Sequence, residues 1–357
     1  MTTMKKIFMI AMAAATFVGC GNATKFTITG SLEAEDGKLV YIATEEGREL
    51  NYIDSVAVAA NTYAFEGTAE APYSAYLVTK EGEEARPKMV AQLYVEPGNI
   101  EVKKLNEEHP TANAVGTPLN DKKADLFVKQ WELQKDENAA EDAITKLYYE
   151  NILANADNMI GWDLFGDTYY YYEPQQVIDA IAAMPAEQQE KFKSIKESSE
   201  QALKVLPGNP YIDITEVGEG EQPKTLTPDG KVLTLKSVVE NKANKYVLID
   251  FWASWCGPCM REVPHLKAAY DKYHKKGFEI YGVSFDRDRE PWLKAIDEKG
   301  LNWLHVSAVN YWDNKARHDY AVNSIPANFL VDCSTGKIIA TQLRGEEVEK
   351  KMEELLK

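Results

Sequence analysis

The chain has 357 residues, of which 40 are basic and 56 acidic, so that its formal net charge at pH 7 is −16. Because domains usually contain about 100 to 200 residues, this length predicts two or three of them. The acidic excess argues against nucleic acid as a partner, since binding to phosphate requires concentrated Lys and Arg.

The chain begins MTTMKKIFMIAMAAATFVGC, with two lysines ahead of an apolar run from Ile7 to Val18. That run is too short to span a bilayer, so we interpret residues 1–19 as a signal peptide. The segment resembles the signal of bacterial lipoproteins, which implies cleavage before Cys20 and attachment of lipid to it. Since no acidic cluster follows Cys20, the resemblance favours an anchor in the outer membrane that faces the periplasm. The alternative is an ordinary cleaved signal with a chance cysteine.

Residues 20–118 are predicted to form an antiparallel β domain. From Lys25 to about Val102, short runs rich in Val, Ile, Tyr and Thr alternate with DG, EG and PG pairs, a pattern typical of strands and turns. A DSV strand, a Y-x-F-x-G strand and a late EPGNIEV give this part a resemblance to an uncharacterised β domain of bacterial lipoproteins. That resemblance implies no catalytic residues.

Residues 119–207 form a helical region in this prediction. Apolar residues recur there at spacings of three and four, as in NDKKADLFVKQWELQK, EDAITKLYYENILANA and PAEQQEKFKSIKESSEQALKVL. The four tyrosines at 169–172 are interpreted as packing rather than as a ligand surface.

Residues 208–357 carry an α/β pattern. A PDG turn predicts a hairpin in TLTPDGKVLTL, and the apolar run KYVLIDFWA predicts a central strand covered on both faces. A helix, the strand FEIYGVSF, a helix opening near Pro291 and the stretch LNWLHV complete a βαβ pattern. The hairpin of ANFLVD with KIIAT and a final helix end the chain.

Cys256 and Cys259 stand where the central strand gives way to a helix. A helix N-terminus offers unpaired N–H groups and partial positive charge, which favour the reactive thiolate. Cys256 is therefore expected to attack a disulfide and Cys259, one turn on, to resolve the mixed disulfide. A closed zinc site would need two further ligands, and only Cys333 and scattered histidines are left, so we predict no metal. A disulfide that only stabilises the fold, or an inactive domain that kept its fold, would also account for the pair.

The segment WCGPC resembles the active site of thioredoxins, and the resemblance extends over residues 208–357. It implies a central mixed sheet flanked by helices, a buried proton-relaying acid at Asp250, and a helix kinked at Pro264. YAVNSIPANFLVD resembles the segment with a cis-proline, which implies a cis bond before Pro326 and a backbone at Ile325 that pairs with the substrate. The surface that binds the substrate would then comprise Trp255, Gly257, Pro258, Ile325 and Pro326.

Within that family the pattern resembles the membrane-tethered, periplasmic branch related to the reductases of cytochrome c maturation. This implies a reductase of protein disulfides that works through its own cysteine pair without a cofactor. In an oxidising compartment such a reductase needs an electron donor, which we expect to be a membrane protein. Two alternatives stay open: an oxidase that donates its disulfide, and an envelope protein whose β and helical parts bind a protein or ligand. Cys333 is interpreted as a turn residue, with a regulatory role as the alternative.

Overall fold

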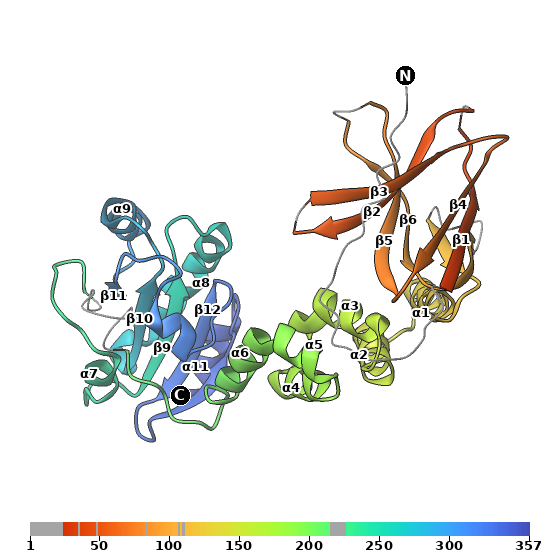
Figure 1. Ribbon diagram of the computed structural model, residues 1–357. Coiled ribbons are helices and arrows are strands. Elements are labelled where there is room, and N and C mark those ends of the chain that lie inside the picture. The colour runs from red at the N-terminus through yellow and green to blue at the C-terminus, as the bar shows by residue number, and fades with distance from the viewer. Residues whose placement is uncertain are drawn as a thin grey trace. The chain divides into compact units, whose positions relative to one another are not determined.

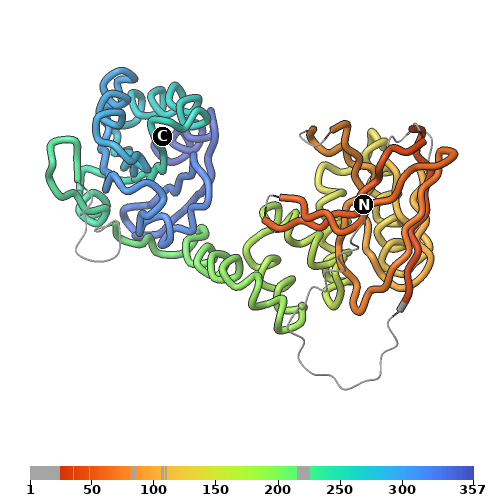
Figure 2. The backbone as a smooth tube through the Cα atoms, turned by 45° about the horizontal axis from the view of Figure 1, so that its top comes forward, coloured from red at the N-terminus to blue at the C-terminus, as the bar shows by residue number. Residues whose placement is uncertain are grey.

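The computed structural model describes residues 24–34, 36–47, 49–82, 85–105, 108, 111–214 and 226–357. Contacts divide the chain into two compact units, Met1–Thr168 and Tyr169–Lys357, and Figure 1 and Figure 2 trace the chain through each of them. The predicted signal peptide and Cys20 lie outside the described residues. Within the described ranges, no helix combines the length and the apolar character that crossing a membrane would require.

Two four-stranded sheets form the N-terminal part of the first unit (Figure 1). One sheet has the order β4-β1-β7-β8 and the other the order β3-β2-β5-β6. The strands are β1 (Thr24–Ser31), β2 (Leu39–Glu46), β3 (Glu49–Ala57), β4 (Thr62–Ala69), β5 (Tyr73–Thr79), β6 (Lys88–Val95), β7 (Gly98–Lys104) and β8 (Ala112–Val115).

Side chains of both sheets meet in one buried core, so this part is a β-sandwich. In β1, Phe26 and Ile28 are buried between more exposed neighbours, as expected of a strand with one face on a core. Among the described strand pairs of this unit, only β1 with β7 is parallel. The predicted antiparallel β domain is confirmed, with one parallel pair that alternation within single strands could not reveal.

The helices α1 (Pro118–Lys135), α2 (Ala143–Ala154) and α3 (Met159–Thr168) complete the first unit. The sequence pattern predicted α1 and α2 but not α3, which contains Gly161 and Gly166. Gly161 is required by a close approach, because a Cβ there would lie 2.3 Å from the carbonyl oxygen of Asn155.

After the turn Tyr169–Tyr171, the helices α4 (Pro174–Ala182), α5 (Ala186–Lys191) and α6 (Lys193–Leu203) open the second unit. Both α4 and α5 pack against α6. The middle of the chain is helical, as predicted, but its helices are divided between the two units, so the predicted boundary between 207 and 208 falls inside the second. In the tyrosine run, Tyr172 is buried while Tyr170 and Tyr171 are exposed.

The second unit is built around a five-stranded sheet of order β11-β10-β9-β12-β13. Its strands are β9 (Tyr246–Trp252), β10 (Phe278–Ser284), β11 (Leu304–Ser307), β12 (Ala327–Asp332) and β13 (Lys337–Thr341). The first three pair in parallel, whereas β12 is antiparallel to both β9 and β13. The sheet is therefore mixed, as predicted, with the apolar run 246–252 at its centre.

Helices α7 (Leu235–Val239), α8 (Gly257–Tyr273), α9 (Arg289–Lys299), α10 (Lys315–Asp319) and α11 (Glu347–Leu355) accompany this sheet, and the short 3₁₀ turn η2 (His274–Lys276) follows α8. Helix α8 begins at the cysteine pair, with Pro258 in its first turn where a missing N–H costs nothing. Its stripe Val263, Leu266, Tyr270 and Tyr273 is buried, as predicted. Helices α8 and α11 pack against each other.

The predicted hairpin around the PDG turn is present with short arms. Its described part is a tight turn in which the N–H of Thr227 donates to the carbonyl oxygen of Lys231 at 2.8 Å. Leu226 makes isolated bridges to Val232 and to Ser307 of β11, so one arm pairs with the edge of the sheet. The other arm ends at Thr234, which caps α7.

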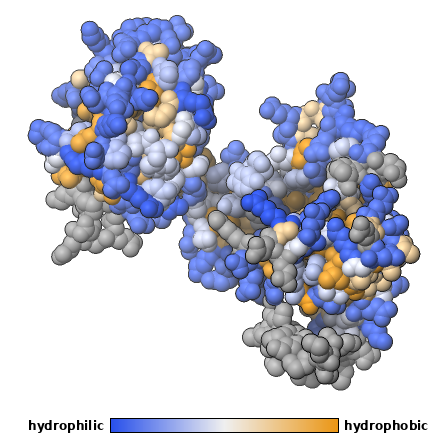
Figure 3. Space-filling view, turned by 90° about the horizontal axis from the view of Figure 1, so that it is seen from above, coloured by the Kyte–Doolittle hydropathy of each residue, from blue (hydrophilic) through white to orange (hydrophobic). Residues whose placement is uncertain are grey.

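Hydrophilic residues cover most of the face of the second unit that Figure 3 shows, with apolar residues in smaller groups between them. This distribution is expected of a chain that has many charged residues and buries its apolar side chains in two cores.

Candidate redox site

The cysteine pair lies at the N-terminus of α8 and forms a disulfide between Cys256 and Cys259. Cys256 is the N-cap residue, and its Sγ accepts the N–H of Cys259 at 3.1 Å. Each cysteine is only 4% exposed. The N–H of Cys259 and the positive end of the helix therefore lie at the sulfur that is expected to be the nucleophile.

The proline segment lies directly beside this pair. The bond between Ile325 and Pro326 is cis, as the resemblance implied, and the carbonyl oxygen of Ile325 lies 3.7 Å from Cys256 Sγ. The register of the sheet explains this approach, because Ala327 at the start of β12 pairs with Phe251 near the end of β9. The residues before β12 and those after β9 are thereby brought to the same edge of the sheet.

Asp250 is 6% exposed and lies on β9, paired with Gly282 of β10 and Asn328 of β12. Burial raises the pKa of its carboxyl from 3.8 to about 7, although the positive charge of Arg344 opposes the shift. A carboxyl with a pKa close to neutral can both accept and donate a proton at ordinary pH. This property suits the proton-relaying role expected of Asp250.

Two charged residues of the site were not predicted from the sequence. Glu262, one turn after Cys259, raises the pKa of Asp250 further by its negative charge, and its Oε2 accepts the N–H of Gly345 at 2.8 Å. Arg344 donates from Nη2 to the carbonyl oxygen of Pro326 at 2.6 Å. The helical spacing could have indicated Glu262, but no local signal points to Arg344, which lies in the connection that follows β13.

A buried aspartate fixes the loop ahead of the cysteines. Asp286 is 1% exposed, and its carboxylate accepts hydrogen bonds from the backbone N–H and the hydroxyl of Ser254. The hydroxyl of Ser284 donates to the same carboxylate at 2.7 Å. The carbonyl oxygen of Asp286 accepts the N–H of Tyr311 at 3.4 Å, so this residue connects the loop before Cys256 with the loop after β11.

The residues expected to bind the substrate present a surface around the disulfide. Trp255 is 48% exposed, Gly257 and Pro258 are exposed, and Ile325 and Pro326 are half-buried.

Two aromatic residues of the loop after β11 extend that surface and were not predicted. The ring centroids of Tyr311 and Trp312 lie 5.3 Å and 6.4 Å from that of Trp255. Val309 and Tyr311 adopt left-handed backbone conformations, with φ of 55° and 60°. Such conformations are costly for residues other than glycine, so the surrounding structure has to hold this loop in place.

Several further candidate residues lie apart from the pair. At a rise of about 1.5 Å per residue, the backbones of His265 and His274 lie about 9 Å and about 22 Å beyond that of Cys259 along the helix axis. These distances are too long for either histidine to form a Cys–His nucleophile pair. Cys333 lies in the turn after β12, and burial of its half-buried thiol raises its pKa to about 11. In the described part of the chain, no three His, Cys, Asp or Glu side chains are grouped so that they could hold a metal ion.

Two parts of the chain are similar to known protein families. Residues 244–338 match a family model described as thioredoxin-like, and residues 26–122 match a domain of unknown function (DUF4369). Over 129 residues, or 36% of this chain and 69% of the relative, the chain is 31% identical to the thiol-disulfide oxidoreductase ResA of Bacillus thuringiensis. Over 113 residues, or 31% of this chain and 63% of the relative, it is 30% identical to the protein of the same name in Geobacillus thermodenitrificans.

Among solved structures, the thioredoxin domain of a thiol-disulfide oxidoreductase from Bacteroides vulgatus is 32% identical and covers 42% of this chain and 98% of its own, with a TM-score of 0.37.

Proposed function

Because this chain belongs to the thioredoxin-like thiol-disulfide oxidoreductases, we propose that it reduces disulfides of exported proteins through Cys256 and Cys259. The observation that carries this proposal is the cysteine pair at the start of α8, with the carbonyl oxygen of Ile325 lying 3.7 Å from Cys256 Sγ. One side of the nucleophile is thus lined by backbone that a substrate chain can pair with.

In the proposed reaction the Cys256 thiolate attacks one sulfur of a substrate disulfide. The other substrate sulfur leaves as a thiolate and takes up a proton, and a mixed disulfide remains on Cys256. Cys259 then loses its proton and attacks Cys256 Sγ, which releases the second substrate thiol and leaves the disulfide of the oxidised enzyme. Two electrons and two protons pass to the substrate in each cycle.

Asp250 is the group that moves the proton of Cys259 in this proposal. Its carboxyl is buried, and its pKa of about 7 lets it take up a proton from Cys259 and return it to solvent near neutral pH. Arg344 and Glu262 adjust that pKa in opposite directions. The raised pKa of Asp250 supports the proton-relaying role that the resemblance implies for this residue.

Two variants test the assignment of the nucleophile. Cys256→Ser should abolish reduction of protein disulfides, because serine cannot form the mixed disulfide. Cys333→Ser should keep the activity, since the pKa of the Cys333 thiol is raised by burial and its residue lies in a turn outside the site. Reduction by the Cys256→Ser variant at the normal rate would mean that this mechanism is wrong.

The direction of the reaction depends on the reduction potential of the pair. The Gly257-Pro258 sequence between the cysteines favours reduction by analogy with thioredoxins, whereas a disulfide-donating oxidase would use the same two cysteines. We would equilibrate a soluble form beginning at Gly21, with Cys333→Ser, against defined thiol buffers. A potential at or below about −250 mV supports the reductase, and one near about −120 mV would make the protein an oxidase.

The enzyme in this proposal belongs to the cell envelope, where lipid on Cys20 holds it at the outer membrane on the side that faces the periplasm. A reductase in that compartment has to be recharged, so the proposal includes an electron donor, which we expect to be a membrane protein. Mass spectrometry of the mature protein tests the anchor: lipid on an N-terminal Cys20 supports it, and an unmodified N-terminus beyond Cys20 contradicts it.

A further inference from the structure

A groove of about 600 Å³ opens in the second unit, with α6 on one side and α10 and the segment that joins α10 to β12 on the other. Ser194, Glu197 and Ser198 belong to its α6 wall, and His318, Ala321 and Asn323 to the opposite wall. Hydroxyl, amide and charged groups of both signs line it. Such a lining can form hydrogen bonds with a polypeptide backbone and with polar side chains, and Ile195 and Ala321 add apolar contacts.

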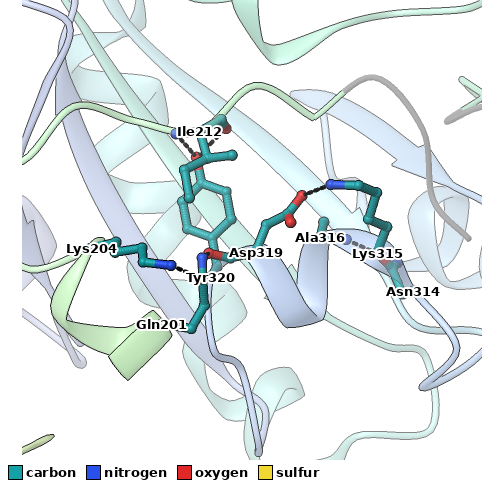
Figure 4. Close-up of polar contacts among 8 residues, drawn as sticks. All are labelled: Gln201, Lys204, Ile212, Asn314, Lys315, Ala316, Asp319 and Tyr320. Atoms are coloured by element: carbon teal, nitrogen blue, oxygen red, sulfur yellow. Dashed lines mark hydrogen bonds and ion pairs between the residues drawn. The ribbon is translucent and has the colours of Figure 1, made fainter. Parts of the chain in front are cut away.

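The two walls of the groove are fastened to each other. Gln201 of α6 donates from Nε2 to the carbonyl oxygen of Asp319 at 2.7 Å and accepts a hydrogen bond from Lys204 at 3.0 Å. Figure 4 shows Gln201 reaching the C-terminal end of α10. Asn323 donates from Nδ2 to the hydroxyl of Ser198 at 3.0 Å. The groove is therefore formed before a partner arrives.

The chain that follows α6 is also fixed to this part of the unit. The hydroxyl of Tyr320, a residue 1% exposed, donates to the carbonyl oxygen of Ile212 at 2.6 Å and accepts the N–H of Ile212 at 3.0 Å (Figure 4). Closer to α6 in the chain, the N–H of Gly208 donates to the carbonyl oxygen of Ile338 in β13 at 2.8 Å. The chain that leaves α6 is thus held at both Gly208 and Ile212.

One residue of the groove lining is close in the chain to the segment that lies beside Cys256. Asn323, on its wall, is two residues from Ile325, a span of at most about 7 Å, and the carbonyl oxygen of Ile325 lies 3.7 Å from Cys256 Sγ. An extended substrate chain advances about 3.3 Å per residue. A chain that brings its cysteine to Cys256 along Ile325 and continues toward Asn323 would therefore reach the groove with the residues about two to four positions away.

We propose that this groove is a subsite for the protein substrate, which holds an extended polar segment on one side of the cysteine to be reduced. The enzyme then reacts faster with disulfides in polypeptides than with disulfides in very short peptides. This inference rests on the proposed function, in which Cys256 attacks the substrate disulfide. It gives α6 a part in substrate recognition.

Single-turnover kinetics with two synthetic disulfides test the subsite. One is the disulfide-linked dimer of Ala-Cys-Ala. The other is the dimer of an eleven-residue peptide with a central cysteine flanked by Gly, Ser, Asn and Gln. The purified full chain is reduced first, so that its two site thiols become a disulfide as each peptide disulfide becomes two thiols, and the tryptophan fluorescence is followed. We expect the rate constant for the long peptide to exceed that for the short one about tenfold, which corresponds to about 1.4 kcal/mol.

Matched variants on α6 assign the effect to the groove. Glu197→Trp fills the groove and should lower the ratio of the two rate constants toward one. Glu200→Trp makes the same change at an exposed position of α6 outside the lining and should keep the ratio of the unsubstituted protein. Ser194→Trp fills the groove from a second position, and it replaces Glu197→Trp in this test if that variant does not fold.

Equal rate constants for the two peptides in the unsubstituted protein would overturn the subsite, and so would a ratio that Glu197→Trp and Ser194→Trp leave unaltered. Failure of the reduced protein to react with either peptide would instead contradict the proposed function.

Discussion

Asp250 shows how a single buried charge connects stability with chemistry. It lies in β9, where the other residues from Val247 to Trp252 are also buried, and burial raises the pKa of its carboxyl to about 7. A folded-state pKa above that of the unfolded chain means that the folded protein binds the proton more tightly. Ionisation of Asp250 therefore destabilises the fold while it serves proton transfer.

Asp250→Asn is expected to stabilise the protein in a pH-dependent way. Below about pH 4 the carboxyl of Asp250 is protonated in both the folded and the unfolded protein, so the variant and the unsubstituted protein should have similar free energies of unfolding. As the pH rises toward 7 the unfolded chain loses its proton first, and above pH 7 the unsubstituted protein has lost roughly 4 kcal/mol of unfolding free energy that the variant keeps. Urea unfolding at pH 4, 6 and 8 measures this, with the exposed Asp271→Asn on α8 as control. An equal gain at pH 4 and pH 8 would contradict the assignment.

Asp286→Ala is expected to destabilise the second unit by about 2 to 4 kcal/mol. The change leaves the hydroxyls of Ser254 and Ser284 and the N–H of Ser254 without the carboxylate that they bond in a buried place. The loop before Cys256 should loosen as well, so the rate of disulfide reduction should fall. Thermal unfolding and the reduction rate measure the two effects. Asp288→Ala, at an exposed residue close by in the chain, should change neither by much.

Among the elements, pairing between strands determines which distant residues meet. The pairing of β12 with β9 brings the cis-proline segment to the cysteine pair. The pairing of β10 with β9 and β11 places Gly282 against the side chains of Trp252 and His305. Burial lowers the pKa of His305 to about 3, so this histidine is neutral and acts as a packing residue.

Gly282→Ala is expected to destabilise the protein by about 1 to 3 kcal/mol, because the added Cβ would lie 2.8 Å from Nδ1 of His305 and 3.1 Å from Nε1 of Trp252. Gly166→Ala offers the contrast, since nothing lies within 4 Å of its added Cβ in α3 and alanine favours helix by up to about 1 kcal/mol. Thermal unfolding measures both. If Gly282→Ala were as stable as the unsubstituted protein, β10 would not be packed as described.

In the molecule as a whole, each unit has its own buried core. The division at Thr168 assigns α4, α5 and α6 to the unit that contains the cysteine pair. Hydrogen bonds from α6 to the α10–β12 segment explain that assignment, because they join helices of the middle region to the sheet region.

Residues 169–357 alone are therefore expected to fold and to reduce a short peptide disulfide at a rate within about threefold of that of the full chain. Residues 208–357, which lack α4 to α6, should also contain the cysteine pair but unfold at a lower temperature, since the contacts of Gln201 and Ser198 are lost. Circular dichroism and thermal unfolding compare the two fragments. Equal stability would favour the boundary predicted between 207 and 208.

Local patterns in the sequence were enough to predict several features of the fold and the site. Apolar runs and their periods predicted strands of the N-terminal β domain, the central strand β9 and one apolar face of α8, but not the arrangement of the β domain as a sandwich. The CGPC spacing after an apolar strand predicted that the cysteine pair stands at a helix start, where the helix terminus acts on thiols within one turn. That Cys256 and Cys259 are the residues that react stays a prediction. The resemblance of the segment around Pro326 to the cis-proline segment of thioredoxins predicted two further features. These are the cis bond between Ile325 and Pro326 and the position of this segment beside the cysteine pair.

Contacts between residues far apart in the chain became visible in the folded molecule alone. Arg344 reaches Pro326 and influences Asp250, Asp286 fixes Ser254, and Tyr311 lies beside Trp255. These partners are distant in the sequence, and none produces a periodic signal within its own segment. The same holds for α6, whose sequence predicts a helix but not the neighbour against which it packs. Such contacts follow from strand register and from connections between elements, which a pattern of neighbouring residues does not encode.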